Sequence, residues 1–181
     1  MNTLKKLASW KVILPLFLLY LLLALVLFPR YQNQINAAAG QEIIPLDLRI
    51  TYTPADVQET YSLIGAEGRA IKQAMYRGLD MVYPLVYGLL FTLLILNLLN
   101  GIGDKNWGFL LLLPLISMVF DYLENFSMLN FLAQYPDINE PRIHIASYFT
   151  SLKWLLRLAC ALIVAVLGVI RLSSFIQDNK D

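Results

Sequence analysis

The hydrophobic pattern of the chain consists of four apolar blocks separated by polar segments. The blocks cover residues 12–28, 80–100, 108–128 and 145–172. Each is long enough for a helix that crosses the roughly 30 Å hydrocarbon core of a bilayer. A hydrophobic content of 58% and a mean hydropathy of +0.59 also indicate an integral membrane protein. The pattern therefore predicts an all-α fold in which residues 1–181 form a single four-span membrane domain, a four-helix bundle.

The polar segment 30–78 is predicted to be a long extracytoplasmic loop between the first two spans. A loose alternation of apolar and polar residues over 43–52 permits a short extended segment. Thr53 and Pro54 then predict a helix start, with threonine as the N-cap and proline at the first helical position. A second helical stretch begins at Arg69 and runs into the next span. We expect the loop to contain an amphipathic helix, which either lies over the membrane surface or caps the bundle.

The first apolar block shares some features with a signal peptide. Lysines precede it, and small residues that resemble a cleavage site follow at 37–39. The block is longer than a usual signal-peptide core, however, and the alanines lie well beyond its end. We therefore predict an uncleaved first span.

Four spans place both termini on the same side of the membrane. The amino-terminal lysines, together with Lys105, Arg171 and Lys180, favour the cytoplasm as that side. We expect a multi-pass protein of a plasma membrane, with the bacterial inner membrane as the compartment and both termini cytoplasmic.

A polar cluster interrupts the third apolar block. Asp121, Glu124 and Asn125 are spaced i, i+3 and i+4, so a helix presents all three on one face. The fourth block carries Lys153 and Arg157 at a spacing of four residues. Ionisable groups are rare in membrane spans, so their gathering predicts a functional site.

The depths of these charges match. Counting about 1.5 Å of rise per residue from the predicted cytoplasmic ends places Asp121 and Arg157 roughly 20 Å up their helices. Glu124 and Lys153 lie roughly 24 and 27 Å up by the same count. Because an isolated charge at that depth is costly, we predict that Asp121 pairs with Arg157 and Glu124 with Lys153. The cluster then lies in the outer third of the membrane, toward the extracytoplasmic side.

The second span adds polar side chains at similar depth. Tyr83, Tyr87 and Asp80 fall roughly 20 to 30 Å above its cytoplasmic end. We expect Asn125 and the two tyrosines to form hydrogen bonds with the charged groups. The first span has no ionisable residue between Lys11 and Arg30, so it is predicted to form an apolar wall.

Three functions are consistent with such a cluster. The favoured one is a binding or accessory role, in which a polar cavity holds a lipid head group or a small zwitterionic ligand. A second is an intramembrane enzyme that acts on a lipid through Asp121 and Glu124 as acid and base. The third is a salt-bridge network that fixes helix register in a subunit of a membrane complex. The expected partners are membrane lipids, with homo-oligomers also open because small residues recur in the spans.

Other functions are disfavoured. The 14 basic and 13 acidic residues leave no basic patch for nucleic acid. We predict no metal and no cofactor, since His144 is the only histidine and the bases near the carboxylates would compete with a cation. No phosphate-binding glycine loop or nucleophile motif is present. The single Cys160 lies in an apolar block and is predicted to be a free, buried thiol.

The layout resembles that of four-span tetraspan proteins, with a short amino terminus, a large first external loop and a smaller second one. The loop 30–78 contains no cysteine, so the cysteine motif of claudin-type first loops is absent. The resemblance concerns layout alone and implies no activity.

Overall fold

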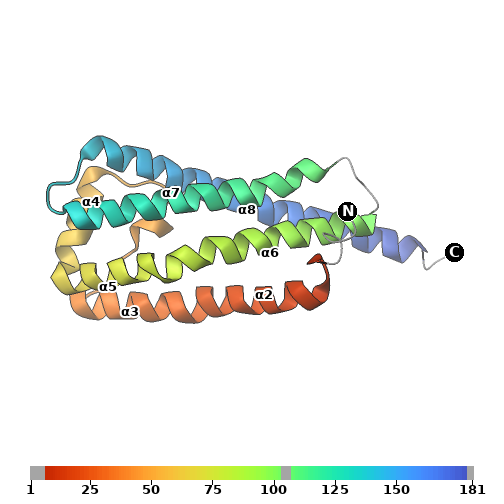
Figure 1. The fold of residues 1–181 in the computed structure, drawn as a ribbon, viewed down its shortest axis with the longest axis horizontal. Coiled ribbons are helices and arrows are strands. Elements are labelled where there is room, and N and C mark those ends of the chain that lie inside the picture. Colours follow the sequence, from red (N-terminus) through yellow and green to blue (C-terminus); the bar gives the residue numbers. More distant parts are fainter. Residues whose placement is uncertain (1–6, 103–106, 179–181) are drawn as a thin grey trace.

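The computed structural model describes residues 7–102 and 107–178, and these form a bundle of long helices without strands (Figure 1). Four helical stretches are long and apolar enough to cross a membrane: Trp10–Ala39, Gly65–Ile102, Gly108–Gln134 and Glu140–Gln177. The prediction of an all-helical protein with four such helices is therefore confirmed. The first and last described residues lie toward the end of the bundle opposite α4 (Figure 1).

The first stretch consists of α2 (Trp10–Leu22), the π-helical turn η1 (Leu23–Leu27) and α3 (Phe28–Ala39). Pro29 has no amide hydrogen, and its ring crowds the carbonyl four residues earlier. The wider π turn before it accommodates this, and the Phe28 amide donates to the Leu23 carbonyl. The helix then continues to Gly40, whose left-handed conformation (φ 68°) ends it. The predicted loop 30–78 is thus helical over its first ten residues.

The segment after Gly40 is irregular rather than extended. It contains one 3₁₀ turn, η2 (Leu46–Leu48), and no strand lies beside it in the described chain. Of its alternating apolar residues only Leu46 is fully buried, whereas Ile44 and Ile50 are exposed. The alternation does not mark the buried face of a strand in the described chain, because Leu46 and Tyr52 are buried whereas Ile44, Leu48 and Ile50 are exposed.

α4 (Pro54–Leu63) begins as the sequence predicts. The Thr53 hydroxyl accepts from the Asp56 amide, and the Asp56 carboxylate accepts in return from the Thr53 amide. Its Val57 and Tyr61 are fully buried, and the helix packs against α8 and α5 at one end of the bundle (Figure 1). α4 thus covers the end of the bundle, while its position relative to a membrane surface stays a prediction.

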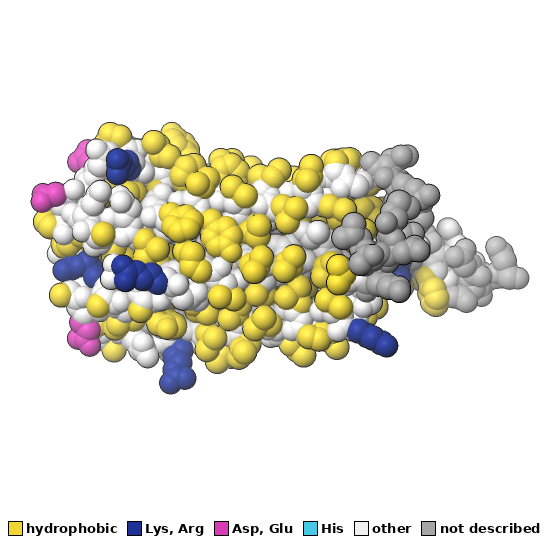
Figure 2. All heavy atoms as spheres, in the orientation of Figure 1, with side chains coloured by type: hydrophobic (Ala, Val, Ile, Leu, Met, Phe, Trp, Pro, Cys, Tyr) yellow, Lys and Arg dark blue, Asp and Glu magenta, His cyan; other side chains and the backbone are white. Residues whose placement is uncertain are grey.

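The remaining helices form the body of the bundle. α5 (Gly65–Arg77) leads almost directly into α6 (Leu79–Ile102), and η3 (Gly108–Leu111) precedes α7 (Leu112–Gln134) and α8 (Glu140–Asp178). α7 packs against both α6 and α8, and the first stretch packs against α5 and α6. Figure 2 shows hydrophobic side chains over the middle of the bundle and charged ones mainly toward its ends.

The buried apolar side chains form two clusters. One lies beneath α4 and includes Ile35, Tyr61 and Phe131. The other lies near the opposite end and includes Ile95 and Leu167. Buried charged residues also occur within the bundle, and they include Lys72, Asp80, Asp121, Glu124 and Lys153.

Candidate functional site

The buried charges of α7 and α8 form one connected network. Arg157 Nη2 lies 2.5 Å from Asp121 Oδ2, and Lys153 Nζ contacts Glu124 Oε2. Lys153 Nζ also lies 3.5 Å from the other Asp121 oxygen, so Asp121 bridges the two bases. Both pairs expected from the depth count are present. Because α7 and α8 pack along their lengths, residues spaced by three or four positions on each helix meet in register.

A hydrogen bond from a neutral group adds to the ion pair of Glu124. This residue is fully buried, and its Oε1 accepts a 2.5 Å hydrogen bond from the Thr150 hydroxyl. Thr150 lies within 3.3 Å of the Tyr52 hydroxyl. Burial, followed by the proximity of Glu124, raises the pKa of Tyr52 well above its ordinary value. Tyr52 is therefore a neutral group next to this carboxylate.

Asn125 does not bind the charged groups as expected. Its Nδ2 donates a 2.7 Å hydrogen bond to the backbone carbonyl of Asp80 on α6. That carbonyl lacks its usual helical donor because the residue four positions on is Pro84, which has no amide hydrogen. A neighbouring helix often satisfies a carbonyl that a proline frees within a membrane span. The structure assigns Asn125 this backbone role.

The two predicted tyrosines present ring faces to Arg157. The guanidinium carbon lies 4.2 Å from the ring centre of Tyr87 and 5.5 Å from that of Tyr83. Trp154 contributes a third ring at 4.9 Å. Tyr83 also packs edge-on against Phe28 of the first stretch, with ring centres 5.0 Å apart. Cation–π contacts of this kind stabilise a desolvated arginine.

Asp80 differs from the other acidic residues of the site. Its residue exposure is 6%, and within the described chain its carboxylate makes no ion pair. Its Oδ2 is buried and has no hydrogen-bond partner among the described residues. Among the described residues, Arg157 Nε is the only other buried side-chain atom without a hydrogen-bond partner. Both a carboxylate acceptor and a guanidinium donor are thus unsatisfied in this region.

The sequence analysis missed a second ion pair, which reaches the site from the loop. Asp47 Oδ1 of η2 lies 3.2 Å from Lys72 Nζ of α5 and 3.3 Å from the Tyr76 hydroxyl. Burial alone would raise the pKa of Asp47, but Lys72 and Lys153 outweigh burial and hold this pKa below its ordinary value. Lys72 lies one helical turn before Tyr76 on the same face of α5, and this i, i+4 spacing was the available signal.

The loop is anchored on α8 by side chains of the fourth span. Trp154 Nε1 donates a 3.0 Å hydrogen bond to the Asp47 carbonyl, and the Ser147 hydroxyl accepts a 2.9 Å bond from the Tyr52 amide. On the other side, Gln32 Nε2 of α3 donates to the Ile43 carbonyl. The loop therefore closes the end of the polar region and is tied to both flanking helices.

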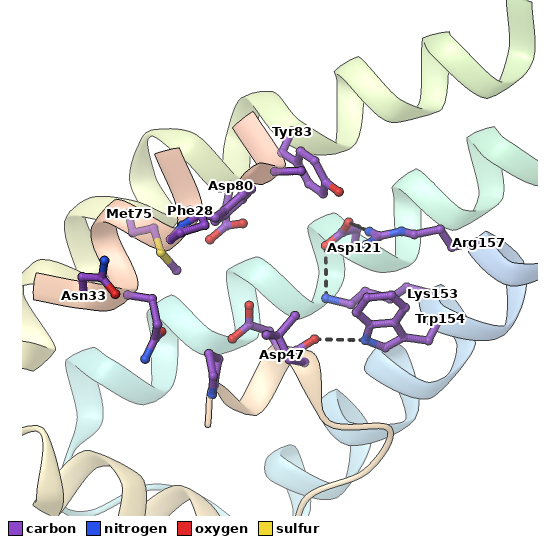
Figure 3. Close-up of a pocket in the computed structure, with 15 residues that line it drawn as sticks. Phe28, Asn33, Asp47, Met75, Asp80, Tyr83, Asp121, Lys153, Trp154 and Arg157 are labelled. Carbon is purple, nitrogen blue, oxygen red and sulfur yellow. Dashed lines mark hydrogen bonds and ion pairs between the residues drawn. The ribbon is translucent and has the colours of Figure 1, made fainter. Parts of the chain in front are cut away.

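A cavity of about 430 Å³ lies among these groups (Figure 3). Figure 3 shows Asp47, Asp80, Asp121 and Lys153 directed toward a common space from four different elements. Of the predicted site residues, Glu124, Asn125 and Tyr87 do not line this cavity. The cavity is lined by Ala24, Phe28, Pro29, Gln32, Asn33, Pro45, Asp47, Leu48, Met75, Asp80, Tyr83, Asp121, Lys153, Trp154 and Arg157.

The first stretch contributes more than the predicted apolar wall. Ala24 lies in the π turn η1, where the backbone is widened, and Gln32 and Asn33 bring amides to the cavity. Gln32 and Asn33 lie beyond Phe28, the last residue of the predicted span. The first helical stretch therefore contributes polar groups to the lining from the part that extends past that span. Single π turns inside α-helices often lie at functional sites.

The described residues contain no group of three His, Cys, Asp or Glu side chains that could hold a metal ion. His144 is exposed near the start of α8, and Cys160 is buried with a free thiol. The lining of the cavity offers carboxylates, an ammonium, a guanidinium, amides and aromatic rings, which can recognise charged and hydrogen-bonding groups.

Comparisons of the chain with protein-family models, with curated protein sequences and with solved structures found no match. The fold and the site define a class on their own: an all-helical protein with four helices able to cross a membrane and a charged cavity inside the bundle.

Proposed function

We propose that this protein binds a lipid head group or a small zwitterionic molecule in the cavity between the first helical stretch, α6 and α8. The observation that carries the proposal is a cavity of about 430 Å³ whose lining contains both carboxylates and bases. This volume is in the range of small-molecule sites. A head group occupies the charged part, while an acyl chain extends along the apolar surface of the helices.

The arrangement supports binding over a purely structural network. Charges that only fix helix register can be packed directly against each other, as Lys153 and Glu124 are. Here Asp80, Asp121, Lys153 and Arg157 also line an open volume. Water or a ligand fills a polar cavity of this size, and a zwitterionic ligand offers partners of both signs to the charges that line it.

The enzyme alternative has less support. It needs Asp121 and Glu124 near a substrate, yet Glu124 does not line the cavity and is held by Lys153 and Thr150. Asp121 is bound by two bases. Trapping of an intact lipid by a Glu124→Gln variant would favour catalysis over binding.

A pair of tryptophan variants tests the proposal. Ala24→Trp places an indole in the cavity, whereas Leu25→Trp, one residue on, replaces a side chain that is 67% exposed on the outer surface. Native mass spectrometry of protein purified in mild detergent should detect a retained molecule in the wild type and in Leu25→Trp but not in Ala24→Trp. The proposal fails if the wild type retains nothing, or if Ala24→Trp retains the same molecule.

A further inference from the structure

We infer that the ligand of this cavity carries a protonated amine whose N–H groups bind the Asp80 carboxylate. The inference rests on the proposed binding function and specifies the ligand chemistry. It starts from the three carboxylates that line the cavity: Asp47, Asp80 and Asp121.

Two of the three carboxylates already have partners in the chain. Asp47 pairs with Lys72, and Asp121 pairs with Lys153 and Arg157. Asp80 is buried, with only 6% of its surface exposed. It nevertheless has no base within hydrogen-bond distance among the described residues. A buried, unpaired carboxylate is costly. Among the three, Asp80 is the acidic group that a ligand cation would find without a base of the described chain beside it.

The type of cation follows from the missing hydrogen bond. Asp80 Oδ2 is an acceptor without a donor, so the cation needs an N–H group. A primary ammonium supplies three such donors, while a quaternary ammonium supplies none. The rings of Phe28 and Tyr83, which pack edge-on in the same wall, add faces that attract a cation.

A second unsatisfied group indicates an anion next to the amine. Arg157 Nε is the only other buried side-chain atom of the described residues without a partner, and it is a donor. Asp80 and Arg157 line the same cavity from α6 and α8. An amine joined to a phosphate through a short linker complements both, whether it belongs to an aminophospholipid or to a free phosphoethanolamine.

The test compares three lipids and one soluble compound. Purified wild-type protein is titrated with phosphatidylethanolamine, phosphatidylcholine, N-acetylated phosphatidylethanolamine and free phosphoethanolamine, and bound species are quantified by native mass spectrometry. We expect phosphatidylethanolamine to bind about tenfold or more tightly than the other two lipids, the ratio that a charge-assisted hydrogen bond supplies. Comparable binding of phosphoethanolamine identifies a soluble ligand, and its absence identifies the lipid.

Two variants localise the effect. Asp80→Asn keeps the side-chain size but removes the charge, and it should abolish the preference for phosphatidylethanolamine over phosphatidylcholine. Asp137→Asn, which changes an exposed carboxylate outside the cavity, should behave like the wild type. The lipid comparison in the wild type needs no variant, so it decides the matter even if Asp80→Asn fails to fold.

The outcomes separate this inference from the proposed function. Equal binding of phosphatidylethanolamine and phosphatidylcholine by the wild type, or an unchanged preference in Asp80→Asn, overturns the amine assignment while ligand binding stands. Retention of an acidic lipid without an amine overturns it as well. If the wild type binds none of the compounds and retains no molecule from the membrane, the binding function itself fails.

Discussion

The side-chain amide of Asn125 donates a 2.7 Å hydrogen bond to the backbone carbonyl of Asp80. Pro84 deprives that carbonyl of its helical donor, so Asn125 of α7 takes the place of an amide within α6. The bond joins two helices at the level where the unpaired Asp80 carboxylate lines the cavity. Asn125, which the sequence places with the charged cluster, therefore links α7 to the backbone of α6 instead of binding the charged groups.

Replacing Asn125 should destabilise the protein most while Pro84 is present. Asn125→Leu leaves the Asp80 carbonyl buried and unsatisfied, which we expect to cost about 1–3 kcal/mol. In a Pro84→Ala background the amide of residue 84 can bind that carbonyl, so the same change should cost clearly less. Unfolding of the four proteins in detergent, followed by circular dichroism, measures the coupling. Additive effects of the two substitutions would contradict the assigned role.

The ion-pair network predicts unequal contributions from its two bases. Lys153 contacts both Asp121 and Glu124, whereas Arg157 contacts Asp121 and aromatic rings. Lys153→Met leaves Glu124 without its base in a fully buried position, so we expect a loss of about 3–5 kcal/mol. Arg157→Met should cost less, because Lys153 still neutralises Asp121.

A double-mutant cycle checks the pairing of Asp121 with Arg157. Asp121→Asn should destabilise the protein, and adding Arg157→Met should cost less than it does in the wild type. The free energy of unfolding of both single variants and the double variant gives the interaction energy. Independent effects would mean that the 2.5 Å contact contributes no stability.

The sequence predicted the helices and the α7–α8 ion pairs because both depend on local information. Apolar block length sets which segments form long helices, and charges spaced by helical repeats on antiparallel neighbours meet when their depths agree. Asp121, Glu124, Lys153 and Arg157 satisfied both conditions. Whether their cavity serves a ligand is not decided by the pattern and stays a prediction.

The contribution of the loop could not be predicted in the same way. Asp47 belongs to an irregular segment that has no repeat and no membrane depth from which to count, so nothing in its sequence indicates that it reaches Lys72. The role of Asn125 had a visible signal in the spacing of Asp80 and Pro84. Detecting it required knowing that α7 lies beside that turn of α6, which is tertiary information.

Docking of the loop should depend on pH through Asp47. Its pKa is held below the ordinary value in the folded state, so its pairing stabilises the loop above about pH 4 and is lost as pH falls through the folded pKa. Lys72→Met removes the positive charge that most lowers the pKa of Asp47. Because burial then raises this pKa, undocking of the loop should begin at a higher pH. Trp154, which donates to the Asp47 carbonyl, reports docking by fluorescence once Trp10 and Trp107 are replaced by Phe.

The control for this titration is a surface ion pair of the same loop. Arg49 Nη1 lies 2.9 Å from Asp56 Oδ1, and both side chains are about one-third exposed, at 30% and 34%. Arg49→Met should leave the Trp154 profile unchanged, since exposed pairs contribute little. A Lys72→Met profile that superimposes on that of the wild type would show that Lys72 does not set the pKa of Asp47.

At the end of the bundle opposite α4, Gly101 leaves room for the Arg171 side chain. The effect of Gly101→Ala on stability should therefore depend on whether Arg171 is present. Arg171 Nη1 donates to both Asn97 oxygens, at 3.0 and 2.7 Å, and a Cβ at Gly101 would lie 2.5 Å from the Arg171 guanidinium carbon. Gly101→Ala should therefore displace the flexible guanidinium and destabilise the protein by about 1 kcal/mol, the net contribution of the hydrogen bonds it loses. In an Arg171→Ala background the same change should be neutral or stabilising by up to about 1 kcal/mol, since alanine favours the helix over glycine.

Gly168→Ala, where no atom lies within 4 Å of the added Cβ, serves as the control and should stabilise in both backgrounds. Thermal unfolding of the single and double variants measures all three effects, and a destabilising Gly101→Ala without Arg171 would mean that another contact requires the glycine.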